Sequence, residues 1–171
     1  AGAFSRSAKK SKQMAAELYL DESRCYESYS QMIEAEKKLG DDGGIDFVSV
    51  VTPNNSHFEI AKAFLEAGYH VILDKPMTFD LDQAIELKSV VESSGKVFAL
   101  THNYTGYPMV KLAKDMIASG MLGEVRKVVV HYPQGWLATP IERDGAKQAE
   151  WRTDPAQSGA AGCMGDIGTH A

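Results

Sequence analysis

The sequence predicts an α/β protein built on a doubly wound parallel sheet, and three observations indicate this fold class. Short, β-branched apolar runs recur at residues 45–51, 69–73 and 96–100. They are almost continuously apolar, as expected of parallel strands that helices cover on both faces. Segments with helical periodicity separate the runs, and glycines stand between each helix and the next strand. Such alternation of strands and helices is typical of a parallel, doubly wound sheet.

Amphipathic stripes locate the helices. We also expect helices over residues 9–20 and 28–39, before the first strand. Gly40, Gly68 and Gly95 stand where a left-handed residue would close a helix. The three later stripes, with apolar residues at helical spacing, are Ile60, Ala61, Phe64 and Leu65; Ala84, Ile85, Leu87 and Val91; and Val110, Ala113, Met116 and Ile117.

The pattern changes after Gly120, where we expect a second domain to begin. Residues 125–132 predict a strand, and residues 133–162 are typical of a loop. Glycines then recur every third residue from Gly159 to Gly168, which predicts a close-packed turn leading into a helix with Asp166 and His170. We place the boundary near Met121, so that residues 1–121 form the first domain and residues 122–171 begin the second.

The composition is that of an ordinary soluble protein. Of 171 residues, 44% are hydrophobic and 24% are charged, and the net charge is −5. The negative charge argues against nucleic acid or an anionic membrane as the main partner, and no apolar stretch approaches the roughly 20 residues of a membrane span. Cys25 and Cys163 lie far apart, which favours reduced thiols and a cytoplasmic location.

Lys75 is the first candidate for chemistry. It lies in Asp74-Lys75-Pro76, directly after a predicted strand, and ligands of open parallel sheets bind at the carboxyl ends of strands. Proline fixes the backbone direction there. A lysine in a partly closed cleft can exchange a proton with a substrate hydroxyl, although an exposed loop lysine is the plain alternative.

Asp166 and His170 form the second candidate. Their i, i+4 spacing puts both on one face of a helix. A histidine can exchange a proton near neutral pH, and a neighbouring carboxylate can orient it. The alternatives are an N-terminal Asp cap, a solvated His or an incomplete metal site. A metal site needs a third ligand, and no further residue has the spacing for one.

Two polar loops are candidates for a nucleotide site. Residues 51–57 contain Thr52, Pro53, Asn54 and His57; they suit a helix N-terminus capped by asparagine, a loop against a nucleotide, or both. Ser5 and Arg6 end another predicted strand, where an arginine would accommodate a 2′-phosphate and so favours NADP over NAD. The alternative there is a basic, solvated helix start.

Other loop residues carry weaker signals. Asn103 and Tyr104 follow a predicted strand, while Trp151 and Arg152 lie in a predicted loop. They could line a polyol pocket or pack one domain against the other. No Gly-x-Ser-x-Gly elbow or Walker-type loop is present, which argues against serine hydrolases and P-loop nucleotidases; Gly-x-Gly-x-x-Gly is also absent.

These motifs together resemble the Gfo/Idh/MocA family of sugar and cyclitol dehydrogenases. The resemblance covers nearly the whole chain. It implies a Rossmann-type dinucleotide-binding domain at residues 1–121 and the start of an α/β substrate domain at residues 122–171. The segments that carry it are Thr52-Pro53-Asn54 with His57, Asp74-Lys75-Pro76, Trp151-Arg152, and Gly165-Asp166-Ile167-Gly168-Thr169-His170.

The resemblance implies a mechanism and a set of site residues. His170 would take the proton of a substrate hydroxyl as hydride leaves for the nicotinamide, while Lys75 binds the reacting oxygen and Asp166 orients the site. A cis peptide bond would precede Pro76. Substrate-binding residues would be Lys75, Asn103, Tyr104, Trp151, Arg152, Asp166 and His170. Dinucleotide-binding residues would be Ser5, Arg6, Thr52, Pro53, Asn54, His57, Asp74, Lys75 and Pro76.

The sequence also departs from the family pattern. Asp74 replaces the usual glutamate, and the glycine-rich first strand-turn-helix and most of the second domain are missing. Without that first strand we expect a split sheet, a chain that is part of a longer polypeptide, and an isolated 171-residue product that binds dinucleotide poorly and is inactive.

The favoured function is therefore hydride transfer between NADP, or NAD as the alternative, and a secondary alcohol or ketone of a sugar or cyclitol. A catalytically silent dinucleotide-binding sensor of the same fold is the main rival. A hydrolase using Asp166 and His170 would need a nucleophile, for which Thr169 and Cys163 are poor candidates. Family relatives suggest a homo-oligomer, a dimer or tetramer.

Overall fold

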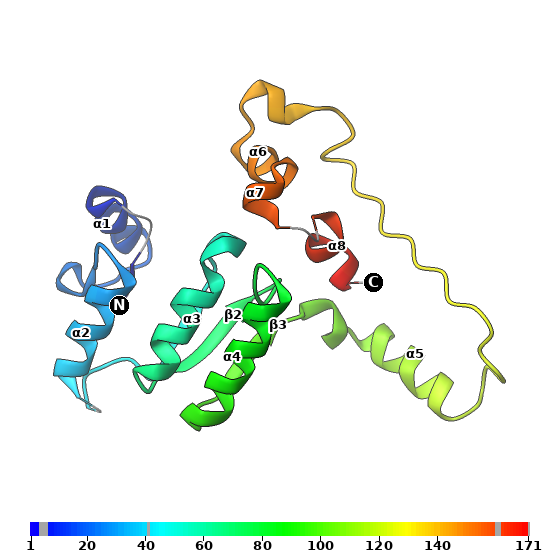
Figure 1. The fold of residues 1–171 in the computed structure, drawn as a ribbon, viewed down its shortest axis with the longest axis horizontal. Coiled ribbons are helices and arrows are strands. Elements are labelled where there is room, and N and C mark those ends of the chain that lie inside the picture. The colour runs from blue at the N-terminus through cyan, green and yellow to red at the C-terminus, as the bar shows by residue number, and fades with distance from the viewer. Residues whose placement is uncertain (4–6, 41, 160–161, 171) are drawn as a thin grey trace. The chain divides into compact units, whose positions relative to one another are not determined.

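The structure is a computed structural model that describes residues 1–3, 7–40, 42–159 and 162–170 (Figure 1). The predicted cofactor residues Ser5 and Arg6 lie outside the described residues. The chain divides into two compact units. The first comprises residues 1–50, 58–72 and 85–99, and the second comprises residues 51–57, 73–84 and 100–171.

A three-stranded parallel sheet in the order β1-β2-β3 confirms the predicted fold class. Its strands are β1 (Phe47–Val50), β2 (His70–Asp74) and β3 (Phe98–Thr101). Burial alternates along β1 and β2, with Val48 and Val71 among the buried residues, whereas Phe47 is 53% exposed. The prediction of strands buried on both faces is therefore wrong for β1, which buries one set of alternate residues.

Helices alternate with these strands as predicted, and Figure 1 labels them along the chain. Ser28 caps α2 by accepting a hydrogen bond from the amide of Gln31. Gly68 and Gly95 have φ angles of 94° and 65°, so each is the left-handed residue that the sequence predicted before a strand. The helices are α1 (Ala8–Glu17), α2 (Tyr29–Leu39), α3 (His57–Glu66), α4 (Leu81–Ser94) and α5 (Pro108–Ala118).

The core of the first unit is mostly apolar, and it also contains the buried polar residues Ser11 and Glu36. Helix α3 contributes Ala61, Phe64 and Leu65, each no more than 1% exposed. The side chain of Glu36, on α2, is also fully buried, and it accepts hydrogen bonds from Arg24 and from the Tyr26 hydroxyl. We call these three residues the Glu36 network.

A second parallel pairing lies outside the three-stranded sheet. Gly2 and Cys25 form an isolated bridge, in which the amide of Gly2 donates to the Arg24 carbonyl at 3.0 Å. No strand was predicted near Cys25. The bridge is separate from the sheet that contains β1.

Residues 125–132 form no strand, so that prediction is wrong. Their backbone groups make no hydrogen bond to any other described residue, and Val128 is 74% exposed. An apolar, β-branched run becomes a strand only beside another strand that pairs with its amides and carbonyls. In Figure 1 this segment is the extended yellow ribbon that follows α5.

Residues 133–162 are less irregular than predicted. They contain α6 (Lys147–Thr153) and α7 (Pro155–Ser158) as well as a 3₁₀ turn at Ile141–Asp144. Asp154 caps α7 by accepting from the amide of Ala156, and Pro155 follows as its first residue. The Asp-Pro pair was therefore a helix-start signal within a segment that we interpreted as loop. None of the described helices is long and apolar enough to cross a membrane.

Candidate active site

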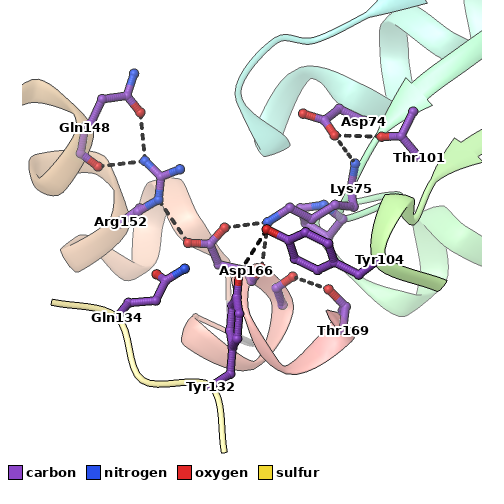
Figure 2. Close-up of polar contacts among 12 residues, drawn as sticks. Asp74, Lys75, Thr101, Tyr104, Tyr132, Gln134, Gln148, Arg152, Asp166 and Thr169 are labelled. Atoms are coloured by element: carbon purple, nitrogen blue, oxygen red, sulfur yellow. Dashed lines mark hydrogen bonds and ion pairs between the residues drawn. The ribbon is translucent and has the colours of Figure 1, made fainter. Parts of the chain in front are cut away.

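The turn after β2 fixes Lys75 through its neighbour Asp74. The Oδ1 atom of Asp74 accepts from the Lys75 amide at 2.9 Å and from the Thr101 hydroxyl, at the end of β3, at 2.7 Å (Figure 2). The peptide bond between Lys75 and Pro76 is cis, as the resemblance implied. Asp74 therefore ties the backbone of Lys75 to the end of the adjacent strand.

His57 supports the same turn from below the surface. Its ring is 1% exposed, and its two nitrogens lie 2.7 Å from the carbonyl oxygens of Pro76 and Thr52. The ring thus links two loops that each follow a strand. His57 is also the first residue of α3, which agrees with the helix-start alternative. Both of its ring nitrogens are hydrogen-bonded to backbone carbonyls.

Lys75 forms a hydrogen-bonded ion pair with Asp166, which lies 91 residues later in the sequence. The Lys75 Nζ atom lies 2.6 Å from both the Oδ1 atom and the backbone oxygen of Asp166. The two side chains are 17% and 20% exposed, so the pair is shielded but still reaches solvent. An ammonium group has three N–H donors. Two are directed at Asp166, and the third has no partner among the described residues, so it can donate to a ligand oxygen.

The carboxylate of Asp166 is held on its other side by Arg152. The Arg152 Nε atom donates to Oδ2 at 3.0 Å (Figure 2). Burial alone would raise the pKa of the Asp166 carboxyl, but the hydrogen bonds from Lys75 and Arg152 outweigh it and hold that pKa below its ordinary value. Asp166 is therefore ionised at neutral pH.

His170 lies among aromatic rings beside this pair. Its ring centroid is 4.4 Å from that of Tyr104 and 6.3 Å from that of Tyr132, and Tyr132 donates a hydrogen bond to the Tyr104 hydroxyl at 2.9 Å. Burial, followed by the charge of Lys75, lowers the pKa of the imidazole. His170 is thus neutral near pH 7 and can accept a proton. Its Nδ1 atom is buried and has no hydrogen-bond partner among the described residues.

These groups line a cavity of about 490 Å³, a size typical of small-molecule sites. Amide, hydroxyl and indole groups surround the charged ones, which is a lining that can hydrogen-bond several hydroxyls of a ligand. The residues are Asp74, Lys75, Asn103, Tyr104, Tyr132, Gln134, Trp136, Gln148, Arg152, Asp166, Ile167 and His170.

The structure brings most of the predicted substrate residues together. Trp151 is the exception, because its ring stacks on Arg152 and does not line the cavity. Five cavity residues were missed: Tyr132, Gln134, Trp136, Gln148 and Ile167. Tyr132, Gln134 and Trp136 are polar or aromatic residues at or just after the end of an apolar run, which was a weak signal of a binding loop. Gln148 precedes Arg152 by one helical turn, which was a weak signal that the two side chains are neighbours.

The predicted dinucleotide residues are more dispersed. Thr52 and Pro53 are exposed, whereas Asn54 is 7% exposed and begins the 3₁₀ turn Asn54–Ser56 without a side-chain cap bond. The predicted asparagine cap is therefore not formed by Asn54. Of the members of this set that the structure describes, Asp74 and Lys75 alone line the cavity.

The continuous helix predicted for Asp166 and His170 is wrong. Helix α8 (Cys163–Asp166) ends at Asp166, and His170 belongs to a separate 3₁₀ turn, Gly168–His170. Two glycines within six residues lower helix propensity, which favours short turns over one helix. Gly159 makes this compact region possible, because its φ is 85° and an added Cβ would lie 3.1 Å from the Phe79 carbonyl oxygen.

Comparison with known proteins identifies the family. Residues 1–102 match the model of an oxidoreductase family with an NAD-binding Rossmann fold, named GFO_IDH_MocA, and residues 110–171 match the GFO/IDH/MocA C-terminal domain. The boundary near Met121 remains a prediction.

Individual relatives agree with this match. The uncharacterised oxidoreductase YfiI of Bacillus subtilis is 39% identical over 99% of this chain and 43% of its own length. Levoglucosan dehydrogenase of Pseudarthrobacter phenanthrenivorans is 35% identical over 78% of this chain and 33% of its own length. The chain spans less than half the length of these relatives.

A solved structure covers the same residues. The inositol dehydrogenase homologue of Azotobacter vinelandii in complex with NAD⁺ is 37% identical, with a TM-score of 0.92 over 99% of this chain and 43% of its own. Its complex with NADH and myo-inositol is 36% identical, with a TM-score of 0.86 over 99% of this chain and 42% of its own. The chain belongs to the Gfo/Idh/MocA family of oxidoreductases.

Proposed function

We propose that the full-length protein is an NAD(P)-dependent dehydrogenase that oxidises a secondary alcohol of a sugar or cyclitol. One observation carries this proposal: an ammonium group, an ionised carboxylate and a neutral imidazole, from Lys75, Asp166 and His170, line one cavity. The relatives support the substrate class, since they include a levoglucosan dehydrogenase and a protein crystallised with myo-inositol.

The residues divide the proton chemistry between them. The free N–H of Lys75 donates to the oxygen of the reacting alcohol and stabilises the charge that develops there. His170, neutral because its pKa is lowered, takes the hydroxyl proton as a general base. Asp166 keeps the Lys75 ammonium in place through its 2.6 Å contact.

The chain also offers a suitable place for a dinucleotide. Thr52 and Pro53 follow β1, and Asp74 begins the turn that follows β2. Open α/β sheets bind dinucleotides at the carboxyl ends of adjacent strands, and the exposed Thr52 hydroxyl suits such a ligand. When bound, the nicotinamide supplies the hydride acceptor.

The test is an activity screen of the full-length protein with cyclitols and monosaccharides, each offered with NAD⁺ and with NADP⁺. We expect absorbance of reduced nicotinamide to appear with at least one polyol. Tight dinucleotide binding without turnover of any polyol would contradict the proposal and favour a dinucleotide-binding sensor.

Cofactor choice has its own experiment. Arg6 favours NADP, because a guanidinium can bind the 2′-phosphate. We expect Arg6→Ala to weaken NADP⁺ binding by about tenfold or more, the loss of one charge-assisted contact, and to leave NAD⁺ binding nearly unchanged. Equal losses for both dinucleotides, measured by calorimetry, would refute the role of Arg6.

A further inference from the structure

Arg152 lines the cavity, and its guanidinium lies against two indole rings. Its guanidinium carbon is 4.2 Å from the centre of the Trp151 ring and 5.3 Å from that of Trp136. Both distances are within the range of cation–π attraction. The side chain is 25% exposed, so contact with the rings leaves only part of it open to solvent.

Two of the three guanidinium nitrogens of Arg152, Nε and Nη1, donate to the protein, and Nη2 has no hydrogen-bond partner among the described residues. Its Nη1 atom donates to the backbone oxygen of Gln148 at 2.9 Å and to the Oε1 atom at 2.7 Å (Figure 2). The same Oε1 atom accepts from the indole of Trp151 at 3.2 Å. Because Gln148 and Arg152 are one turn apart on α6, the helix itself sets the direction of the guanidinium.

Among the described residues, this guanidinium donates a hydrogen bond to one group outside its helix, the Oδ2 atom of Asp166. The other carboxylate oxygen, Oδ1, faces the Lys75 ammonium. A carboxylate with a different cation on each oxygen cannot rotate without losing both contacts. The orientation of Asp166, and through it the position of Lys75 Nζ, therefore depends on Arg152.

We propose that Arg152 is a positioning residue that orients Asp166 toward Lys75. This differs from the substrate-binding role that the sequence suggested. The catalytic consequence rests on the proposed function, whereas the effect on Asp166 follows from the contacts alone.

The first experiment needs no turnover. The carboxyl of Asp166 is titrated by ¹³C NMR in the full-length protein and in Arg152→Met, which keeps a long apolar side chain. Removing one of two cations while burial persists should raise the pKa of Asp166. Arg143→Met is the matched control, because the Arg143 side chain is 80% exposed, and it should leave the titration unchanged. An unchanged titration in Arg152→Met would overturn the proposal.

The second experiment separates positioning from substrate binding. Misplacing a reacting group by about 1 Å can cost about 100-fold in rate. We therefore expect Arg152→Met to lower kcat by about that factor with KM within about twofold of the wild type. A raised KM with an unchanged kcat would show that Arg152 binds substrate, and would overturn the proposal.

A lysine variant tests the geometry further. Arg152→Lys keeps the charge but loses the planar fork and much of the stacking. We expect the pKa of Asp166 to return toward its wild-type value while kcat recovers only in part. Full recovery of kcat would show that charge alone matters, which would contradict positioning.

Two further measurements keep the outcomes distinct. If Arg152→Met does not fold, Gln148→Ala removes the other anchor of the guanidinium and should lower kcat in the same direction by a smaller factor; no change in kcat would count against the proposal. If the wild type turns over no polyol, the proposed function fails, while the Asp166 titration still decides the role of Arg152.

Discussion

Two carboxylates of this protein each meet an arginine, and their surroundings differ in a way that separates stability from chemistry. Glu36 has a fully buried side chain, and Arg24 and Tyr26 complete its hydrogen bonds. Asp166 is 20% exposed and lines the cavity with Lys75 and Arg152. The Glu36 carboxylate is closed off from solvent. The Asp166 carboxylate instead shares a cavity with an ammonium group whose third N–H has no partner among the described residues.

The electrostatics of the two networks follow the same rule. Burial would raise the pKa of Glu36, but hydrogen bonds from Arg24 and Tyr26 lower it, just as Lys75 and Arg152 do for Asp166. Burial and Glu36 raise the pKa of Tyr26 to about 12. A shifted carboxyl pKa is therefore no evidence of function by itself. Access to a cavity is what distinguishes Asp166 from Glu36.

Among substitutions in the two networks, we expect the largest loss of activity from Lys75→Met. Lys75→Met removes the donor to the reacting oxygen, and we expect kcat/KM to fall by about 1,000-fold, within the usual range for proton-transfer groups. The free energy of unfolding should fall only modestly, because Asp166 loses its hydrogen bond from Lys75 but is 20% exposed and keeps the one from Arg152. Comparable activity in the variant, measured with the best substrate of the screen, would remove Lys75 from the mechanism.

The reverse outcome is expected for Glu36. Glu36→Gln removes the charge that Arg24 and Tyr26 bind, so we expect the free energy of unfolding to fall by about 2 kcal/mol, the scale for hydrogen bonds to a charged group. Activity per folded molecule should remain near that of the wild type.

Denaturant titration measures the effect of this change. Glu34→Gln, on the exposed side of the same helix, is the matched control and should be nearly neutral. If Glu36→Gln were as stable as the wild type but inactive, the contrast between the two networks would be wrong.

The pH dependence of activity sharpens the account of the open network. His170 must be neutral to accept a proton, and its pKa is lowered from 6.5 by burial and by Lys75. We therefore expect the acidic midpoint of the kcat/KM profile to lie below pH 6.5. A midpoint above 6.5, after correction for substrate and cofactor ionisation, would contradict the proposed environment of His170.

The smallest effect concerns stability in acid. The pKa of Glu36 is lower in the folded state than its ordinary value of 4.5, so its contribution is present above that pH and is lost as the pH falls through the folded-state pKa. Unfolding free energies measured from pH 6 to pH 3 should fall less steeply for Glu36→Gln than for the wild type. Parallel curves would show that Glu36 does not contribute to the acid sensitivity.

Local sequence patterns predicted secondary structure best where a single short segment determines the element. The stripe around Phe64 predicted α3, and Gly68 and Gly95 marked the turns before β2 and β3. The run at residues 125–132 failed for the complementary reason. A strand needs a neighbour to pair with, and no local pattern can supply that neighbour.

The candidate site shows the same division. Motifs identified Lys75, Asp166 and His170 individually, and the resemblance to a family linked them. Local signals for Trp151 and Gln148 were weak and did not indicate their contacts with Arg152, because those contacts depend on where each side chain lies around the guanidinium. The packing of helices and loops in the folded chain sets these contacts.

For this protein, residue pattern alone was enough to define an α/β fold, its main helices and strands, and the three side chains on which the proposed chemistry depends. Backbone propensity and hydrophobic periodicity act over a few residues, so a linear reading can detect them. The tertiary structure decided which carboxylate is enclosed and which faces a cavity, and that an arginine expected to bind substrate holds Asp166. Those outcomes depend on distances between groups up to 91 positions apart, which only packing of the folded chain determines.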